Sequence, residues 1–249
     1  EGPASGFVDK AAVQYGGKLA RIRPCRVIHF KIDAAALKAV ASGKGATVTA
    51  YILSLMFVAV RRATDKIDGE FSIQVPVNMR KFYPSETLRN FSMYCGIRLP
   101  LAEISEPDRL LPEITRQLRE KASRQAMDEM VKATNRITNA IRFIPLFLKS
   151  PVVRLVYGFL SDRIFSSTFS NLGVVSMPPE IAGYIDGMDI VLGTAITNRV
   201  GCSMLTYGNT AMLSVSKNTA DPSFEEAMYE LLCRDGLTPD VEGSELIAD

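Results

Sequence analysis

Short hydroxyl side chains are concentrated in residues 163–179, which read Arg-Ile-Phe-Ser-Ser-Thr-Phe-Ser-Asn-Leu-Gly-Val-Val-Ser-Met-Pro-Pro. The β-branched and aromatic residues predict a strand, which the glycine and the two prolines would end. Side chains alternate between the faces of a strand, so Ser166, Thr168 and Ser170 would lie on one face. The other face would carry Ser167, Phe169 and Asn171. A row of buried donors predicts polar partners or a ligand, because an unpaired buried hydroxyl costs about 1–3 kcal/mol.

The simpler interpretation is that these hydroxyls bond to neighbouring backbone groups or to water. The pattern alone favours this interpretation, because serine and threonine side chains commonly bond to nearby backbone. A ligand-binding strand is the alternative, and the sequence leaves both open.

The chain has a single histidine, His29, which lies between apolar residues in a predicted strand. This setting favours a hydrogen-bonded structural histidine over a general base. The four cysteines are far apart, without C-x-x-C spacing, and together with one histidine they form no zinc-binding pattern. The sequence contains no P-loop and no G-x-G-x-x-G, G-x-S-x-G or H-E-x-x-H motif. The chain is therefore a weak candidate for a complete catalytic centre, and no metal site is expected.

The 249 residues are 47% hydrophobic and carry a net charge of only +2. This composition suffices for one large domain or two small ones. A near-neutral charge without a basic cluster argues against nucleic acid as the main partner. The spaced cysteines and the lack of a signal-peptide pattern favour a reducing compartment, so a cytoplasmic location is expected. Because the chain begins with Glu1, we expect it to be a cut or processed piece of a longer polypeptide.

Strands and helices follow one another along the rest of the chain. Further strands are predicted at residues 26–32, 71–77, 93–99, 185–196, 199–206 and 211–217. Helices are predicted at residues 34–41 with Asp33 as the N-cap, at 47–63, at 107–130, and from a capping box of Ser223 and Glu226 to near Gly236. A short turn at Gly208 would join the last two strands as a hairpin. This order predicts an α/β fold of the two-layer α+β type, with a mixed, largely antiparallel sheet covered by helices.

Two segments lie outside this regular pattern. Residues 1–25 are rich in Gly, Ala and Lys and are interpreted as a linker or arm that precedes a domain at 26–249. In that domain, residues 107–160 would form a helical cover. Their most hydrophobic part, 141–160, contains Arg, Lys and Pro, which argues against a membrane span. It is interpreted as an amphipathic segment packed on the domain or on a neighbour, with an interfacial membrane helix as the alternative.

Several short motifs occur in a defined order. They are Thr-Val-Thr-Ala-Tyr-Ile-Leu at 47–53, Val-Pro-Val-Asn-Met-Arg at 75–80, Leu-Arg-Asn-Phe at 88–91 and Phe-Ser-Asn-Leu-Gly at 169–173, followed by the hairpin and the capped helix. This series, over residues 26–235, resembles the C-terminal lobe of the chloramphenicol-acetyltransferase-like superfamily. That superfamily includes peptide-synthetase condensation domains, polyketide-associated acyltransferases and alcohol acetyltransferases.

The resemblance implies one lobe of a two-lobe transferase. In such enzymes an acyl thioester on coenzyme A or on a carrier-protein phosphopantetheine enters a tunnel between the lobes, and an alcohol or amine enters from the other side. A histidine in a His-His-x-x-x-Asp motif acts as the general base. This sequence has no such motif, since His29 is followed by Phe-Lys-Ile-Asp and lacks the paired histidine. The base would therefore belong to an N-terminal lobe of the same polypeptide, and this chain alone would be inactive.

The resemblance also suggests site residues. Related carnitine acyltransferases use a Ser-Thr-Ser strand to donate hydrogen bonds to the tetrahedral oxyanion, and Thr168, Ser170 and Asn171 are the residues expected to do so here or to line the tunnel. Four polar residues near two predicted strand ends would either shape the substrate tunnel or brace the sheet, namely Asn78, Arg80, Asn90 and Ser92.

The expected partners are the histidine-bearing lobe, a small-molecule acyl acceptor and, as a further option, a carrier protein. No permanently bound cofactor is expected, since the thioester is a co-substrate, and neither nucleic acid nor a membrane is expected as a partner. A non-catalytic binding module of the same fold is the alternative function, because the base is missing from this chain.

Overall fold

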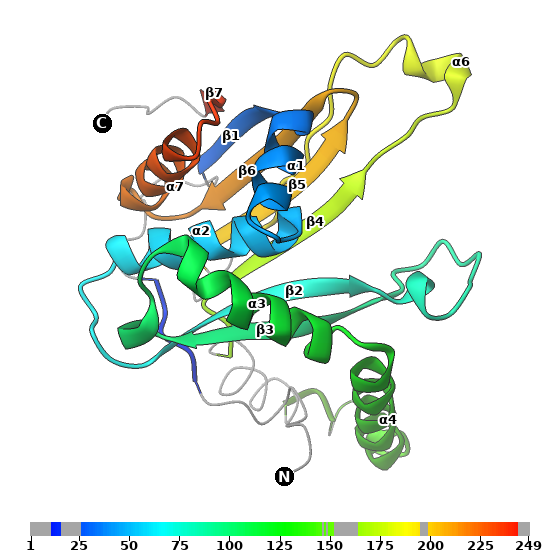
Figure 1. Ribbon diagram of the computed structural model, residues 1–249. Helices are drawn as coiled ribbons and strands as arrows, with labels where there is room; N and C mark the ends of the chain where they lie inside the picture. Colours follow the sequence, from blue (N-terminus) through cyan, green and yellow to red (C-terminus); the bar gives the residue numbers. More distant parts are fainter. Residues whose placement is uncertain are drawn as a thin grey trace.

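A computed structural model describes residues 11–15, 26–145, 147, 149–151, 164–194 and 199–243. Its strands are β1 (Arg26–Asp33), β2 (Glu70–Asn78), β3 (Ser92–Pro100), β4 (Ser167–Val174), β5 (Val200–Tyr207), β6 (Thr210–Lys217) and β7 (Asp240–Gly243). Its helices are α1 (Ala34–Gly43), α2 (Val48–Arg62), α3 (Pro107–Lys121), α4 (Arg124–Ile141), α6 (Pro179–Ala182) and α7 (Ser223–Arg234), with short 3₁₀ turns at Met79–Lys81 and Leu101–Glu103. Figure 1 shows the helices α1, α2, α3 and α7 gathered over one face of the sheet.

The seven strands form one mixed sheet in the order β3-β2-β4-β5-β6-β1-β7. The pairs β2–β4 and β4–β5 are parallel, and the other four pairs are antiparallel. The predicted fold class, a mixed and largely antiparallel sheet covered by helices, is confirmed.

The sheet divides into two limbs between β2 and β4. These strands pair at only two positions, Ile73 with Ser167 and Gln74 with Thr168. Proline at position 76 explains why the pairing stops. The N–H of Ser72 points toward the β4 side, where it donates to the hydroxyl of Ser166. With a period of two, position 76 faces the same side, and Pro76 has no N–H to donate.

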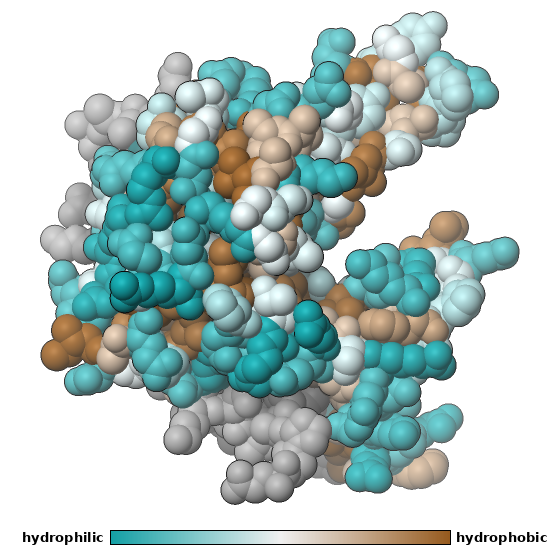
Figure 2. All heavy atoms as spheres, viewed as in Figure 1, coloured by the Kyte–Doolittle hydropathy of each residue, from teal (hydrophilic) through white to brown (hydrophobic). Residues whose placement is uncertain are grey.

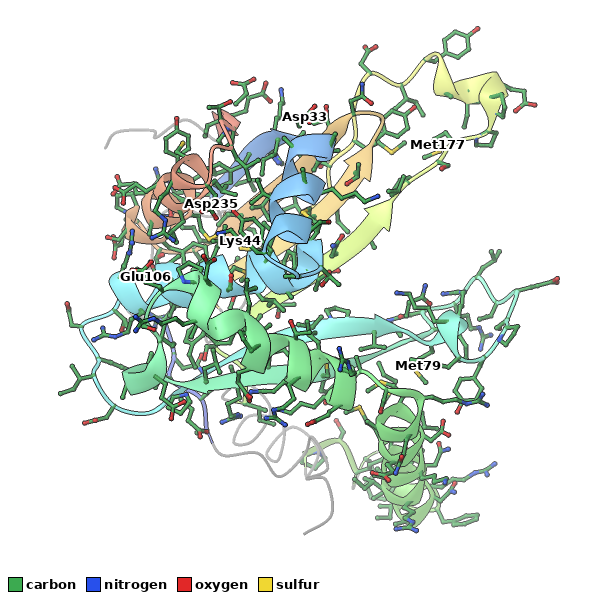
Figure 3. The ribbon with its side chains drawn as sticks, in the orientation of Figure 1. Asp33, Lys44, Met79, Glu106, Met177 and Asp235 are labelled. Atoms are coloured by element: carbon green, nitrogen blue, oxygen red, sulfur yellow. The ribbon has the colours of Figure 1, made fainter. Side chains whose placement is uncertain are left out.

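Beyond that contact the β2–β3 hairpin and the β4–β5–β6–β1 strands diverge, as Figure 1 shows. Figure 2 shows the molecule hollowed between the two limbs, and we refer to this hollow as the notch. Met79 lies on the β2–β3 side of the notch and Met177 on the other side (Figure 3).

Helix α2 is the centre of the core. Eleven consecutive residues, from Ala50 to Val60, are buried. The inner face of β2 packs in the same core, and the rings of Phe57 and Phe71 meet edge to face with centroids 5.9 Å apart. The all-round apolar pattern therefore predicted the burial of this helix correctly.

Local capping residues fix where several helices begin. The carboxylate of Asp33 accepts from the N–H of Ala36, which confirms the predicted N-cap of α1, and the hydroxyl of Thr47 accepts from the N–H of Ala50 at the start of α2. The predicted hairpin is also confirmed, since Gly208, with φ +56°, lies in the two-residue turn between β5 and β6.

Three sequence predictions are corrected. The single helix expected at 107–130 is two helices, because Ser123 ends the first segment and caps α4 through the N–H of Ala126. The capping box of Ser223 and Glu226 does not form, since Asp221 accepts from both the N–H and the hydroxyl of Ser223. Residues 185–194 form no strand but an extended connection from β4 to β5, and the rest of that predicted strand lies outside the described residues.

The described part of the predicted N-terminal arm is packed. The N–H of Val13 donates to the carbonyl of Glu70 at 2.8 Å, and Tyr15 is buried against Phe224 with ring centroids 6.1 Å apart. Residues 11–15 therefore pack on the domain, and Tyr15 is part of its hydrophobic core, although they precede the first strand.

Among the described segments, no single helix is long and apolar enough to cross a membrane. Helices α1 and α2 would suffice together by length and composition, but they are bent by 82° relative to each other. Helix α2 is also buried in the core.

A buried ion pair joins the end of β6 to α7. The Nζ of Lys217 contacts the carboxylate of Glu225, and Lys217 is fully buried while Glu225 is nearly so. Burial lowers the pKa of Lys217 and raises the pKa of Glu225, because each charge is removed from water. Each buried charge is therefore stabilised by the other, and loss of one side chain leaves the other charge buried without a partner.

We expect the substitution Lys217→Met to lower the free energy of unfolding by about 3–5 kcal/mol, because it leaves the Glu225 carboxylate buried without its cation. The double variant Lys217→Met with Glu225→Met should recover most of this loss. Urea unfolding followed by circular dichroism measures both. At the exposed pair Arg62–Glu230, the matched variant Arg62→Met should change stability by less than about 1 kcal/mol. A single variant as stable as the wild type would contradict the proposed role of the pair.

Candidate functional site

The candidate site begins where β4 leaves β2. The hydroxyl of Thr168 donates to Oε1 of Gln74 across this contact, at 3.2 Å. Ser166 accepts from the N–H of Ser72 at 3.0 Å, and Ser167 donates to the carbonyl of Val200 at 2.7 Å. Three of the hydroxyls in this strand therefore have protein partners, as the simpler interpretation of the sequence expects.

Ser170 differs from these residues. Its hydroxyl forms no hydrogen bond with any residue that the structure describes, and the side chain is half-buried. It lies on the same face of β4 as Thr168, opposite the helices, at the position where β2 no longer covers the strand. A donor that is held on a sheet and has no partner among the described residues can serve a ligand at the notch.

Asn171 points to the other face, toward α2. Its Nδ2 donates to the hydroxyl of Thr49 at 3.1 Å, and its Oδ1 accepts from the N–H of Gly173 at 2.8 Å. Gly173 has φ +76°, a conformation that favours glycine. Asn171 thus fixes the first turn of α2 against β4 and shapes the irregular end of that strand. Ser170 and Asn171 are adjacent but face opposite sides, as the strand period requires.

The predicted tunnel residues Asn78 and Arg80 lie at the end of the other limb. Oδ1 of Asn78 accepts from the N–H of Arg80 at 3.0 Å. The guanidinium of Arg80 donates to the carbonyls of Thr87 and Arg89, at 2.6 and 3.1 Å, and lies 5.8 Å from the ring centroid of Phe91. These contacts are all internal to the loop, so they brace it.

Asn90 and Ser92 close the same loop. The hydroxyl of Ser92 donates to Oδ1 of Asn90 at 2.7 Å, and both residues are exposed. The structure thus brings the four predicted tunnel residues together at the tip of the β2–β3 limb. A role in lining a tunnel remains a prediction for all four.

His29 lies on β1, on the face of the sheet opposite the helices. Its Nδ1 is 2.8 Å from the hydroxyl of Ser214, so it has the structural partner that the sequence favoured. The register continues from Ser214 to Ser203 on β5 and from Ser203 to Ser170 on β4. Ser203 and Ser214 were not predicted as site residues, because neither lies in a run of hydroxyl side chains such as that at 166–170.

The connection from β4 to β5 lies over part of the row of polar side chains formed by His29, Ser214, Ser203 and Ser170. The hydroxyl of Ser203 donates to the carbonyl of Ile190 at 2.5 Å, and a Cβ at Gly201 would meet the side chain of Leu192 at 3.5 Å. A Cβ at position 201 would thus make an ordinary van der Waals contact with Leu192, so the connection lies directly on this part of the sheet. Ser203 and Ser214 are therefore explained by packing and hydrogen bonding, whereas Ser170 is not.

Two of the described thiols, those of Cys95 and Cys202, are buried and are not activated for nucleophilic chemistry. Burial raises the pKa of Cys95 to about 11 and also raises the pKa of Cys202, so both stay protonated near neutral pH. Within the described ranges, no group of His, Cys, Asp or Glu side chains could hold a metal ion. The fourth cysteine, Cys25, lies outside the described residues.

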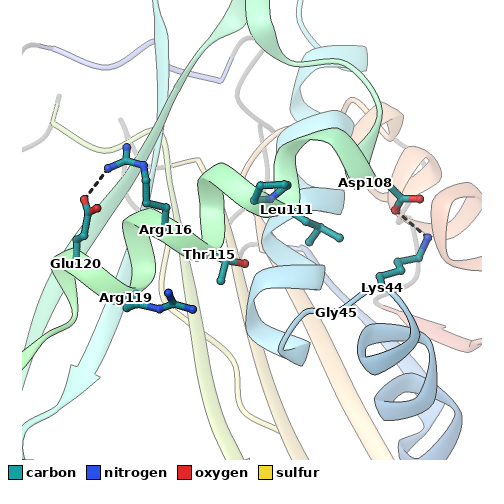
Figure 4. A pocket seen from close by; sticks show the side chains of 9 residues that line it. Lys44, Gly45, Asp108, Leu111, Thr115, Arg116, Arg119 and Glu120 are labelled. Atoms are coloured by element: carbon teal, nitrogen blue, oxygen red, sulfur yellow. Dashed lines mark hydrogen bonds and ion pairs between the residues drawn. The ribbon is translucent and has the colours of Figure 1, made fainter.

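A separate pocket of about 330 Å³ lies on the helical side, between α3 and the turn that joins α1 to α2 (Figure 4). Its charged groups are mostly paired: Nζ of Lys44 is 2.8 Å from Asp108 and 3.3 Å from Asp235. Burial acts to lower the pKa of Lys44, but these two carboxylates outweigh it, so the pKa is raised. The pocket is on the opposite side of the sheet from Ser170 and is not part of the candidate site.

Comparisons with known proteins find resemblance at the level of structure. No protein-family model and no curated protein matches the sequence. Solved structures do match. A trichothecene 15-O-acetyltransferase from Fusarium sporotrichioides matches 92% of this chain and 50% of its own, with a TM-score of 0.61 and 11% identity. The fold is that of condensation and acyltransferase domains.

Two further structures share this acyltransferase fold. The epimerization domain from the third module of tyrocidine synthetase B has a TM-score of 0.56 at 10% identity, over 92% of this chain and 52% of that one. A wax ester synthase/diacylglycerol acyltransferase from Marinobacter aquaeolei VT8 has a TM-score of 0.53 at 14% identity, over 94% and 52%. The chain thus spans about half the length of these three structures.

We expect Asn171→Ala to lower the free energy of unfolding by about 1–3 kcal/mol, because the hydroxyl of Thr49 and the N–H of Gly173 both lose a partner. Chemical denaturation measures this change. The matched variant Asn139→Ala, on the exposed end of α4, should leave stability within about 0.5 kcal/mol of the wild type. Equal stability of the two variants would show that Asn171 does not brace α2.

Proposed function

We propose that this chain is the C-terminal lobe of an acyltransferase that moves an acyl group from a thioester to an alcohol or amine. The acyl donor would be coenzyme A or the phosphopantetheine of a carrier protein. The observation that carries the proposal is Ser170, a half-buried hydroxyl without a partner among the described residues, on a strand at the notch of an acyltransferase fold.

Ser170 would act as a hydrogen-bond donor to the oxyanion. Attack of an alcohol or amine on the thioester carbonyl gives a tetrahedral intermediate with a negative oxygen, and a fixed donor lowers its energy by about 3–4 kcal/mol. Thr168 lies on the same face of β4 as Ser170, but its hydroxyl already donates a hydrogen bond to Gln74. Thr168 would therefore position the strand, while Ser170 contacts the oxyanion.

The general base would come from another lobe. A base must come within hydrogen-bond distance of the proton it removes. His29 is on β1, three strands away from β4, which corresponds to roughly 14 Å at the usual strand spacing. It is also bonded to Ser214. This chain covers about half of each neighbouring structure, which leaves room for a lobe that carries the base.

The strand end and connection beside the notch offer a surface on which such a lobe could pack. Their exposed apolar side chains are Leu172 and Val174 at the end of β4 and Ile181, Tyr184 and Val191 beyond it. Tyr184 is 88% exposed and Val174 is 76% exposed, values unusual for side chains of this size. Figure 2 shows apolar residues along this upper edge of the notch. Burial of the patch by an N-terminal lobe would place a base opposite Ser170.

A non-catalytic module that binds a carrier protein or small ligand is the second candidate. The observation that favours it is the location of the single histidine outside the notch, within a hydrogen bond to Ser214. In that case the notch binds without turnover. The two functions differ in whether a thioester is consumed.

In the intact parent polypeptide, Ser170→Ala should lower kcat about 100-fold to 1,000-fold with little change in KM, because the lost interaction forms only in the transition state. Thiol release from acyl thioesters measures the rate. The matched control is Ser216→Ala, another hydroxyl of the same sheet, which bonds to the carbonyl of Gly201 and lies outside the notch.

Ser216→Ala should keep the wild-type kcat. If Ser170→Ala also keeps it, the oxyanion role is wrong. If the parent consumes no thioester from a panel of acyl groups, yet binds a carrier protein, the binding module replaces the acyltransferase.

A further inference from the structure

Helix α4 has an apolar face that extends beyond the part covered by the domain. Met127, near its start, is fully buried, and Met130 and Val131 are half-buried. From Asn135 to Ala140 every residue is exposed, and Figure 1 shows the helix projecting from the end of α3. The second half of α4 therefore lies in solvent.

This exposed part remains apolar. Ile137 is 49% exposed and Ile144 is 43% exposed, and together with Ile141 they continue the spacing of the covered residues. Two aromatic side chains follow, Phe143 at 90% exposure and Phe147 at 75%. Folding of this domain does not require such side chains in water, so the face is suited to a contact outside the described residues.

The charged side chains of residues 130–151 are all positive. From position 130 to position 151 the sequence contains no Asp or Glu, and it contains four cations, Lys132, Arg136, Arg142 and Lys149. On a helix with 3.6 residues per turn, Lys132, Arg136 and Arg142 lie on the side opposite Ile137 and Ile141. The isoleucine stripe of α4 is thus backed by cations only, and two exposed phenylalanines follow the end of the helix. An apolar face with cations on the opposite side is the pattern of a segment that lies in a membrane interface.

The apolar patch beside the notch has the opposite charge. Positions 172–191 contain three acidic residues, Glu180, Asp186 and Asp189, and no Lys or Arg. One partner surface would not suit both patches, because the acidic one repels anions and the basic one attracts them. The contrast separates the α4 surface from the notch.

We propose that α4 and the residues after it, to position 151, bind the surface of an anionic bilayer. The helix lies in the plane of the interface, with Ile137, Phe143 and Phe147 among the acyl chains and the cations near the phosphate groups. This reverses the expectation from the sequence that no membrane is a partner, and it does not depend on acyl transfer.

Vesicle co-sedimentation of the full chain tests the proposal. Vesicles of phosphatidylcholine with phosphatidylglycerol should retain the chain, whereas vesicles of phosphatidylcholine alone should retain it much less. The variant Lys132→Gln with Arg136→Gln should weaken binding about thirtyfold, from about fivefold for each cation near the surface. The variant Phe143→Ser with Phe147→Ser should weaken it about tenfold or more.

The matched control is Leu88→Ser with Ile67→Ser, which removes two exposed apolar side chains, at 102% and 68%, outside the α4 segment and outside the patch beside the notch. It should bind as the wild type does. Circular dichroism melts check that each variant folds. Binding that is absent, equal on both vesicle types or unchanged in the phenylalanine variant would overturn the proposal. Self-association that these phenylalanines support without vesicle binding would also overturn it, because their partner would then be protein.

Discussion

The structure depends on the short parallel contact between β2 and β4. Only two residue pairs form it, and the bond from Thr168 to Gln74 closes it. A proline at position 76 removes the next N–H that β2 could donate, so the strands part there. The two limbs and the notch follow from this interruption. In a continuous sheet, residue 76 of β2 would have lain beside Ser170, as Gln74 lies beside Thr168.

Small side chains on the face of the sheet opposite the helices have two separate causes. Gly201 and Ser203 lie under the connection from β4 to β5, which contacts them through Leu192 and the carbonyl of Ile190. Ser214 is needed by His29. Neither cause applies to Ser170, because no described residue forms a hydrogen bond with its hydroxyl and β2 does not pair with β4 at this position. Ser170 therefore differs from its neighbours in the sheet, whose small side chains have a structural explanation.

Periodicity predicted most of the fold because its signals are local. The burial of α2, the cap at Asp33 and the turn at Gly208 each depend on residues a few positions apart. Predictions were wrong where two local signals competed. Asp221 accepts from both the N–H and the hydroxyl of Ser223, so Ser223 does not cap α7. Ile190 and Leu192 contact the sheet without pairing with a strand.

The candidate site depended on contacts that no local pattern contains. Alternation along β4 assigned Ser170 and Asn171 to their faces. It did not show that the hydroxyl of Thr168 donates a hydrogen bond to Oε1 of Gln74, a residue 94 positions away in the sequence. It also did not show that the guanidinium of Arg80 turns back into its own loop. Likewise, the near-neutral net charge concealed two apolar patches of opposite charge, since their charges largely cancel in the sum. Because these patches lie on different elements, the proposed contacts with a second lobe and with an anionic bilayer do not compete for the same surface.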